Sequence, residues 1–413
     1  MTPTTRRTLI ALSLALWSST AAAQVISQRG FVDVRSVGFL DEAPNDPTKL
    51  YTDLLAREEV FLKPSQWFRL EGGIDFRANS NNQVDDDWAL DFEDRRVKRP
   101  RFATRRAAAV VTAGKLTIEA GKQFIRWGRA DVLNPTDRFA PRDYVNVLDA
   151  DFLPVLGVHP TLLVGTERLE GVWSPRLTPS RLPLFDQRWV IVPAEAAGIR
   201  PVDTGYRIPD RSQFGVRWTH TGEKLEMSLD YFDGMNHLPN LEFDVQPALG
   251  TALVKRIYPR LRTYGGDIGI PTHLFTLKGE AAYFSSPDDA NNEYVIYVVE
   301  IERQVGEWIF VGGYAGDVSV TDRGVFAFAP DRGIAKSVLA RVSYTVDPRR
   351  TVTFEAAARQ SGDGFYLKGE FSQAIQQHWR VTAAGVLLAG RVGDFIGQFN
   401  RNSNGSIGLR FSF

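Results

Sequence analysis

The sequence predicts an all-β fold, namely a transmembrane, antiparallel, up-and-down β-barrel of about 18 strands. Three observations predict it: apolar and polar residues alternate along most of the chain, short and long connections alternate between the expected strands, and the last segment alternates up to a terminal phenylalanine. Strands that are apolar on one face and polar on the other, joined by short periplasmic turns and long external loops, are typical of barrels in the bacterial outer membrane.

Segment 67–77 illustrates the alternation. Its apolar side chains fall on one face of a strand: Phe68, Leu70, Ile74 and Phe76. Its charged side chains fall on the other face: Arg69, Glu71, Asp75 and Arg77. The same pattern recurs in segments 225–231, 275–283 and 352–359, so we expect an apolar surface toward lipid and a polar lumen.

Eight tight turns can be located in the sequence. They lie at Pro64-Ser65, Ala113-Gly114, Gly165-Thr166, Thr221-Gly222, Pro271-Thr272, Val305-Gly306, Asp347-Pro348 and Gln376-Gln377. One strand on each side of every turn, with a first strand near 30–40 and a last strand near 403–413, gives 18 strands. This even number places both termini in the periplasm. The pattern is weak around Gly165, which leaves 16 strands as an alternative, and 361–364 must form an unusually short external loop.

The N-terminus has the features of a secretory signal peptide. Arg6-Arg7 precedes an apolar run from Leu9 to Trp17, and small residues up to Ala23 supply a cleavage site. A twin-arginine export route is the alternative interpretation of the basic pair. We therefore divide the chain into a cleaved signal peptide, 1–23, and a single barrel domain, 24–413, located in the outer membrane of a Gram-negative bacterium.

The composition excludes several classes of protein. The predicted mature chain has 47 basic and 49 acidic residues, a balance that does not favour nucleic acid as a partner. The absence of cysteine excludes a disulfide scaffold and a thiolate metal site. No apolar stretch of about 18 residues follows the signal peptide, which excludes helical membrane spans.

Aromatic residues mark the predicted periplasmic end of the barrel. Four tryptophans lie within about three residues of a tight turn, where an aromatic girdle would meet the lipid headgroups: Trp67, Trp218, Trp308 and Trp379. The terminal alternation through Phe411 and Phe413 resembles the signal by which barrels are recognised for assembly. The expected partners are therefore the barrel-assembly machinery, outer-membrane lipid and lipopolysaccharide.

Segment 125–156 is too charged and too rich in proline for a membrane strand. Five basic and five acidic residues lie between positions 122 and 151. Because buried charges are costly unless they are paired, we expect this loop to fold into the lumen. There it forms either a constriction whose charges set a transverse field or a structural plug that pairs with the barrel wall. The candidate residues of the solute path are Arg126, Arg129, Asp131, Asp137, Arg138, Arg142, Asp143, Arg69, Arg77 and Arg217.

Several short motifs resemble a broad family of proteobacterial outer-membrane proteins, the DUF1302 group, which is similar in outline to alginate-export barrels. The motifs are Gly121-Lys122-Gln123, Trp127-Gly128, Asn134-Pro135-Thr136-Asp137, Leu169-Glu170-Gly171-Val172-Trp173-Ser174-Pro175 and Tyr258-Pro259-Arg260-Leu261-Arg262. The resemblance covers a small part of the chain. It implies a barrel and names no substrate.

No motif points to an enzyme, a metal or a cofactor. Gly-x-Ser-x-Gly, the P-loop and His-Glu-x-x-His are absent, and the five histidines are scattered. The carboxylates between positions 85 and 94 lack the order of a calcium-binding loop. We interpret 85–106 as a solvated external loop whose basic half contacts lipopolysaccharide phosphates or lies in the mouth of the lumen.

The predicted function is a porin-like channel for small polar or charged solutes, since barrels of 16 to 18 strands leave an aqueous lumen. Two alternatives remain. One is a plugged barrel for uptake or export of hydrophobic compounds or polysaccharide, and the other is a non-conducting structural or assembly barrel of an envelope complex.

Overall fold

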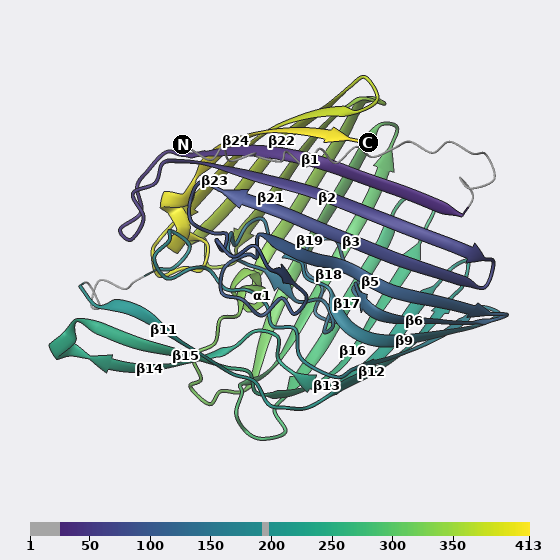
Figure 1. Cartoon of the computed structure of the whole chain (residues 1–413), viewed down its shortest axis with the longest axis horizontal. Coiled ribbons are helices and arrows are strands. Elements are labelled where there is room, and N and C mark those ends of the chain that lie inside the picture. Colours follow the sequence, from purple (N-terminus) through teal and green to yellow (C-terminus); the bar gives the residue numbers. More distant parts are fainter. Residues whose placement is uncertain (1–24, 192–197) are drawn as a thin grey trace, which may run out of the picture.

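The computed structural model describes residues 25–191 and 198–413, so the predicted signal peptide lies outside the described residues. Eighteen antiparallel strands form a closed ring (Figure 1). The ring strands are β1 (Ile26–Phe39), β2 (Leu50–Ser65), β3 (Phe68–Asn79), β5 (Phe102–Ala113), β6 (Leu116–Gln123), β9 (Val155–Val164), β10 (Glu167–Ser174), β12 (Gln213–Thr221), β13 (Glu226–Met235), β16 (Arg260–Pro271), β17 (Thr276–Ser285), β18 (Glu293–Val305), β19 (Trp308–Thr321), β20 (Ser337–Asp347), β21 (Arg350–Arg359), β22 (Gly364–Ile375), β23 (Trp379–Gly390) and β24 (Asn404–Ser412).

Each ring strand pairs with its neighbours in chain order, and the first strand pairs with the last. Strand β1 pairs with β2 along one edge and with β24 along the other, where Phe31 is opposite Ser412 and Phe39 is opposite Asn404. The ring of described strands therefore has no free edge, whose backbone N–H and C=O groups would find no hydrogen-bond partner in lipid. The prediction of 18 strands is confirmed.

All eight predicted tight turns are present, and they lie at one end of the ring. The connections at the other end are longer, except for the link between β21 and β22, which spans only 360–363 as predicted. Short periplasmic turns opposite long external loops are the arrangement of outer-membrane barrels. The strand pair around Gly165 also exists, because Val164 and Glu167 pair directly across that turn.

The alternation in the sequence separates the two faces of the wall as predicted. On β13, Leu229 is 57% exposed on the outer face whereas Asp230 is buried on the inner face. At the turn end, Trp308 stacks on Tyr344 with ring centroids 4.3 Å apart, and Trp379 packs on Phe411 at 4.9 Å. These rings lie on the outer face, because each occupies an outward position of its strand pair.

The long loops carry further structure. The short strand β4 (Leu90–Asp91) pairs in parallel with β5, and β7 (Arg142–Asp143) pairs with β8 (Asp151–Phe152). A separate sheet with the order β11–β15–β14 stands away from the barrel (Figure 1). Its strands and the short helices of the loops are β11 (Arg200–Arg207), β14 (Asn240–Gln246), β15 (Thr251–Ile257), η3 (Pro247–Leu249), α1 (Pro330–Ile334) and η4 (Gly397–Asn402).

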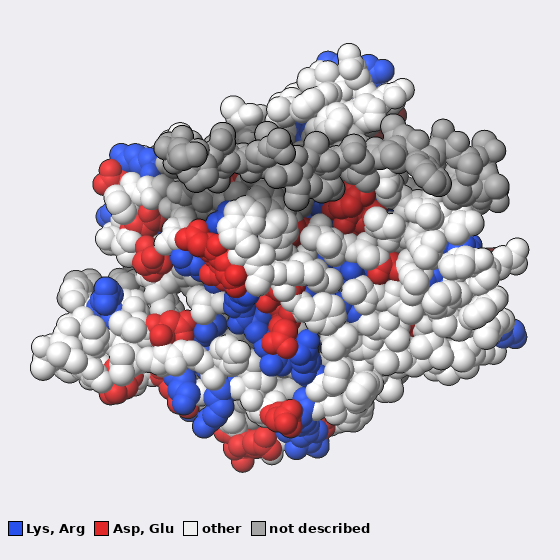
Figure 2. Space-filling model, in the orientation of Figure 1, with Lys and Arg blue, Asp and Glu red and all other residues white. Residues whose placement is uncertain are grey.

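Charge on the visible face is concentrated at the loop end. Figure 2 shows Lys, Arg, Asp and Glu gathered over the loops, while the surface on the right, over the strands, is mostly uncharged. Among the described residues, no helix is long and apolar enough to cross a membrane.

Candidate functional site: the lumen and its folded segment

The segment between β6 and β9, residues 124–154, folds into the barrel and binds an acidic part of its wall. The Glu280 carboxylate on β17 accepts the backbone N–H groups of Arg129 at 2.7 Å, Ala130 at 3.0 Å and Thr136 at 3.0 Å. On β18, Glu300 accepts the N–H of Asp131 at 2.8 Å. The segment predicted from the sequence was 125–156, and the residues between β6 and β9 are 124–154.

The lumen segment is shaped by a compact turn that its own residues build. Asp137 accepts the backbone N–H of Trp127 at 2.6 Å and that of Gly128 at 2.7 Å, and Arg126 approaches the same carboxylate at 3.3 Å. A side chain on Gly128 would collide with Asn134. The Trp-Gly and Asn-Pro-Thr-Asp elements are therefore two halves of one turn, which explains their residue types.

Apolar packing holds the lumen segment against the inner wall. Residues of the segment and of the loop end pack on inward residues of strands between β16 and β23. This cluster contains Ala130, Leu133, Trp189, Leu261, Ala282, Phe284, Ile296, Val298, Ala315, Leu339, Ala357, Leu388, Ile396 and Phe399. Burial of this surface contributes to holding the segment in place, since each Å² of apolar area removed from water stabilises by about 25 cal/mol.

A buried charge network joins three loops near the external end. Asp143 binds Arg99 at 3.0 Å and also binds Arg181, while Lys122 binds Asp94 at 2.6 Å. Burial alone would raise the pKa of Asp143, but the attraction of Arg99 and Arg181 outweighs it and holds that pKa well below its usual range. The Asp143 carboxylate therefore stays ionised, and the network fastens the loops to one another.

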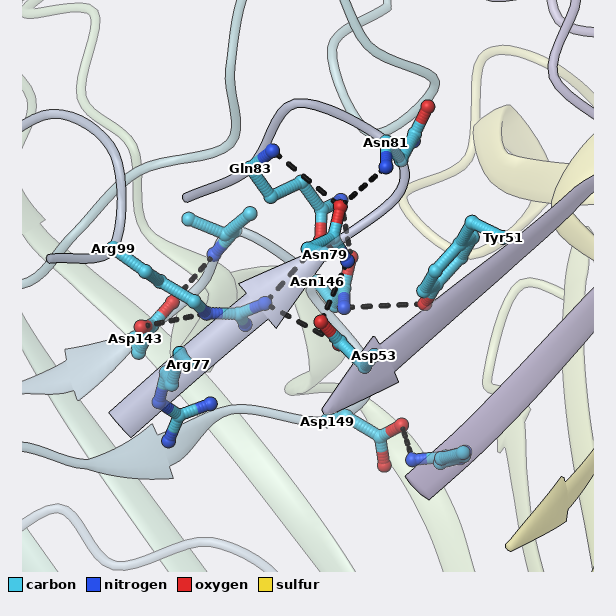
Figure 3. A network of polar contacts seen from close by, with 12 residues as sticks. Tyr51, Asp53, Arg77, Asn79, Asn81, Gln83, Arg99, Asp143, Asn146 and Asp149 are labelled. Carbon is cyan, nitrogen blue, oxygen red and sulfur yellow. Dashed lines mark hydrogen bonds and ion pairs between the residues drawn. The ribbon is translucent and has the colours of Figure 1, made fainter. Parts of the chain in front are cut away.

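Neutral hydrogen bonds extend this network to Tyr51 on β2 (Figure 3). The Gln83 amide donates to Asn146 at 3.1 Å and to Gln187 at 2.8 Å. The Asn146 amide in turn donates to the Tyr51 hydroxyl at 3.3 Å. The loops that follow β3, β6 and β10 are thus joined inside the mouth of the barrel.

The end of the lumen segment presents carboxylates to water next to arginines of the wall. Asp149 forms an ion pair with Arg35 on β1, and Asp151 binds Arg77 on β3 at 3.2 Å. The side chains of Asp149 and Asp151 are nevertheless 41% and 58% exposed. The guanidiniums of Arg126 and Arg142 lie over the ring of Phe152, 4.0 and 4.2 Å from its centroid. This rim, defined as Arg35, Arg77, Arg126, Arg142, Asp149 and Asp151, is the solvated charged edge of the segment.

The two sides of the lumen differ in charge. The wall from β24 through β1 to β5 is rich in inward arginines: Arg29, Arg35, Arg57, Arg69, Arg77, Arg105, Arg106 and Arg410. Inward acids on those strands include Asp33, Asp53, Glu59, Glu71 and Asp75. About half way around the ring, the wall from β13 to β18 carries mainly acids: Glu226, Asp230, Asp267, Glu280, Glu300 and Glu302. Since the lumen segment covers the acidic wall, the arginine-rich wall is the side left facing the lumen.

Most of the predicted residues lie in or beside the lumen segment, and they fall into two groups. One group holds the segment in place, and the other belongs to the rim. Arg129 binds Asp267 and Glu226 of the wall, and Arg217 binds Asp267 at 2.7 Å. Asp131 binds Lys278 at 2.6 Å. These residues, with the buried side chains Asp137, Arg138 and Asp143, fasten the segment. Only Arg77, Arg126 and Arg142 belong to the solvated rim.

One predicted residue lies away from the segment. Arg69 binds Glu71 of its own strand at 2.6 Å, near the turn end of β3. Its position close to the Trp67 turn places it below the lumen segment. Arg69 was predicted to belong to the solute path with the charges of the segment, but its ion-pair partner is Glu71 of the wall.

The rim includes residues outside the set predicted from the sequence. Arg35, Asp149 and Asp151 were not in the predicted set, although Asp149 and Asp151 belong to the charge balance of the segment. The inward position of Arg35 was detectable because Asp33 and Arg35 alternate with Val32 and Val34 on one strand. The pairing of Arg35 with Asp149 could not be detected in this way, because 114 residues separate the two.

The fold is that of outer-membrane porins. A BenF-like porin from Pseudomonas fluorescens matches with a TM-score of 0.56 and 10% identity over 94% of this chain and 97% of that one. OccAB4 of Acinetobacter baumannii matches with a TM-score of 0.54 and 11% identity over 94% and 99% of the two chains. The outer membrane protein OpdK of Pseudomonas aeruginosa matches with a TM-score of 0.54 and 10% identity over 94% and 99%.

These structural similarities show that the fold is that of an outer-membrane β-barrel. No protein-family model matches the chain, and no curated protein matches it. The resemblance to the DUF1302 group therefore stays a prediction.

Proposed function

We propose that the protein is a channel through which small polar or charged solutes diffuse across the outer membrane. The observation that carries the proposal is the rim, where ionised side chains of both signs reach water inside a closed barrel. A purely structural plug would have its charges paired and shielded, whereas Asp151 is more than half exposed beside Arg77.

Water also reaches the wall below the rim. Near the middle of their strands, the inward side chains of Arg341, Glu355 and Glu370 are each roughly two-fifths exposed. These positions alternate with outward apolar residues such as Phe354, so their exposure is to the lumen. A hydrated, charged wall at this level of the barrel supports passage of polar solutes rather than hydrophobic ones.

The uncovered arginine-rich wall should make the channel favour anions over cations. Since the lumen segment neutralises much of the opposite acidic wall, a solute passing the rim meets a surplus of guanidinium groups. Fixed charges act more strongly in a narrow, low-dielectric passage than in bulk water. We therefore expect small anions, or solutes with a carboxylate, to pass more readily than cations of the same size.

Planar-bilayer recording of the purified protein tests the proposal. Discrete conductance steps, with a reversal potential in a salt gradient that favours anions, are the expected result. A folded, heat-modifiable barrel that conducts no ions at any protein concentration would overturn the proposal and favour a non-conducting envelope barrel.

A further inference from the structure

Four aromatic side chains form a continuous row on the outer face of the barrel near its external end. Phe214 on β12, Tyr231 on β13, Tyr264 on β16 and Tyr283 on β17 follow one another with ring centroids 5.9, 5.2 and 6.3 Å apart. They point outward because they alternate with inward residues such as Asp230. Aromatic belts of this kind lie at the boundary between lipid tails and headgroups.

A cluster of cations lies directly beyond this row, on the same outer face. Asp233 is two residues past Tyr231 and is paired across the sheet with Arg262. Three guanidiniums bind its carboxylate: Arg262 at 2.8 Å, Arg211 at 2.9 Å and Arg260 at 3.0 Å. We call these four residues the Asp233 cluster.

The Asp233 cluster has more positive charge than its carboxylate neutralises. Asp288 approaches Arg260 only at 3.9 Å and is itself 56% exposed. Arg211 and Arg262 each direct a single N–H at Asp233, while their side chains remain 36% and 37% exposed. Each guanidinium has five N–H donors, so several donors of the cluster are available to another anion.

The neighbouring charges do not cancel this surplus. Arg323, close to the next strands, is bound by Asp289 and by Glu293 at 3.5 Å, and therefore forms a separate group with its own acids. The exposed donors of Arg211 and Arg262 lie just beyond the aromatic row, and such a row marks the level of the lipid headgroups. Guanidinium groups bind phosphate through paired N–H donors, in a geometry that a single lysine cannot supply.

We propose that the Asp233 cluster is a binding site for a phosphate group on the headgroup of an outer-leaflet glycolipid. In the outer leaflet this chemistry is that of the lipid A part of lipopolysaccharide. The acyl chains would lie along the apolar wall below the Phe214–Tyr283 row, and the phosphate would take the donors that Asp233 leaves unused. This site is independent of the lumen and of the proposed channel function.

Native mass spectrometry of the detergent-purified protein tests the site. The probes are bis-phosphorylated lipid A and the same lipid A with both phosphates removed. The wild-type protein should bind the phosphorylated form preferentially. The double variant Arg260→Gln/Arg262→Gln should lower this preference about tenfold or more, since hydrogen bonds to charged groups are among the strongest in proteins.

A matched double variant, Arg207→Gln/Arg391→Gln, removes two other external arginines, 65% and 79% exposed, and should keep the wild-type preference. Asp233→Asn keeps all three cations and should keep or increase the preference. Excess inorganic phosphate should compete only weakly, because a free ion lacks the acyl chains.

Several outcomes would overturn the proposal. They are equal binding of the two lipids by the wild-type protein, an equal loss in both double variants, and loss of the preference in Asp233→Asn. Displacement of the lipid by millimolar phosphate would point to a simple anion site. Heat-modifiable migration confirms folding of each variant, and Arg211→Gln, which alters a loop residue outside the strands, should show a smaller loss in the same direction if a strand variant fails to fold.

Discussion

One oxygen of the Glu280 carboxylate accepts two hydrogen bonds from Thr136, from its backbone N–H at 3.0 Å and from its hydroxyl at 2.8 Å. The other oxygen accepts the N–H groups of Arg129 and Ala130. A single side chain of the wall thus satisfies four donors of the lumen segment. Because each of these donors is buried or nearly so, Glu280 is the main polar attachment of the segment to the barrel.

Replacing Glu280 by Ala should loosen the lumen segment without unfolding the barrel. Four donors would lose their acceptor, at a cost of about 1–3 kcal/mol for each donor that stays buried. We expect larger fluctuations of the open-channel current in planar bilayers. Glu355→Ala, which removes an exposed carboxylate elsewhere in the lumen, is the control and should leave the fluctuations unchanged. Steady currents in Glu280→Ala would show that apolar packing alone holds the segment.

The rim should set the sign of ion selectivity. Asp149→Asn/Asp151→Asn removes two solvated carboxylates and should shift the reversal potential further toward anions, whereas Arg35→Gln/Arg77→Gln should shift it toward cations. Arg303→Gln, at an outward position of β18, is the control and should change neither. Equal reversal potentials in the two lumen variants would place the rim outside the permeation path.

Deleting residues 129–144 should raise single-channel conductance. The deletion removes the turn around Asp137 and the contacts with Glu280 and Glu300, so the acidic wall would become accessible to water. Neutralising Arg126, Arg129, Arg138 and Arg142 together should shift selectivity toward cations, with most of the shift caused by Arg126 and Arg142, because the other two are bound to the wall or buried. Unchanged conductance after the deletion, in a folded barrel, would contradict the lumen position of the segment.

Adjacent residues of β21 should respond in opposite ways to substitution. Phe354 is 52% exposed on the outer face, and Phe354→Arg should destabilise the barrel by about 2–4 kcal/mol if it lies near the bilayer midplane. Glu355→Gln, on the inner face, should change stability little. Unfolding by urea in lipid vesicles measures both, and equal costs would show that the two faces are assigned wrongly.

The terminal aromatic residues should be needed for assembly. Phe411 packs on Trp379, and the backbone of Phe413 pairs with Gly30 at 3.0 Å, so the end of the chain belongs to the closing seam. Removing Phe413, or replacing Phe411 and Phe413 by Asp, should leave the chain in the periplasm for degradation. Undiminished heat-modifiable barrel in outer-membrane fractions would contradict this expectation.

The fold was predictable because its main determinants are local. Alternation with a period of two fixes the face of each residue, and a short turn fixes the register of the strands that it joins. Both are visible within ten or twenty residues, as in 67–77. The folding of 124–154 into the lumen was also predictable, since Pro135 and Pro141 exclude a central strand and its balanced charges need partners.

The roles of individual charges were not predictable, because they depend on partners distant in sequence. Asp143 and Asp149 lie six residues apart in the same segment, yet the first is buried between arginines of two other loops and the second is solvated. The sheet formed by β11, β14 and β15 was not predicted from the sequence. Its one local signal was the alternation of Leu241, Phe243 and Val245 with polar residues.

The pairing of β1 with β24 has a consequence for the order of biogenesis. Residues 31 and 412 are neighbours in the finished wall, so the cylinder cannot be completed until ribosomes have made the whole chain. Contacts this remote in sequence are slow to form. Until then both terminal strands expose unpaired backbone groups, which a chaperone must shield during transit. Truncation at any point before the last strand therefore yields an open sheet that is prone to aggregation, and it does not yield a smaller pore.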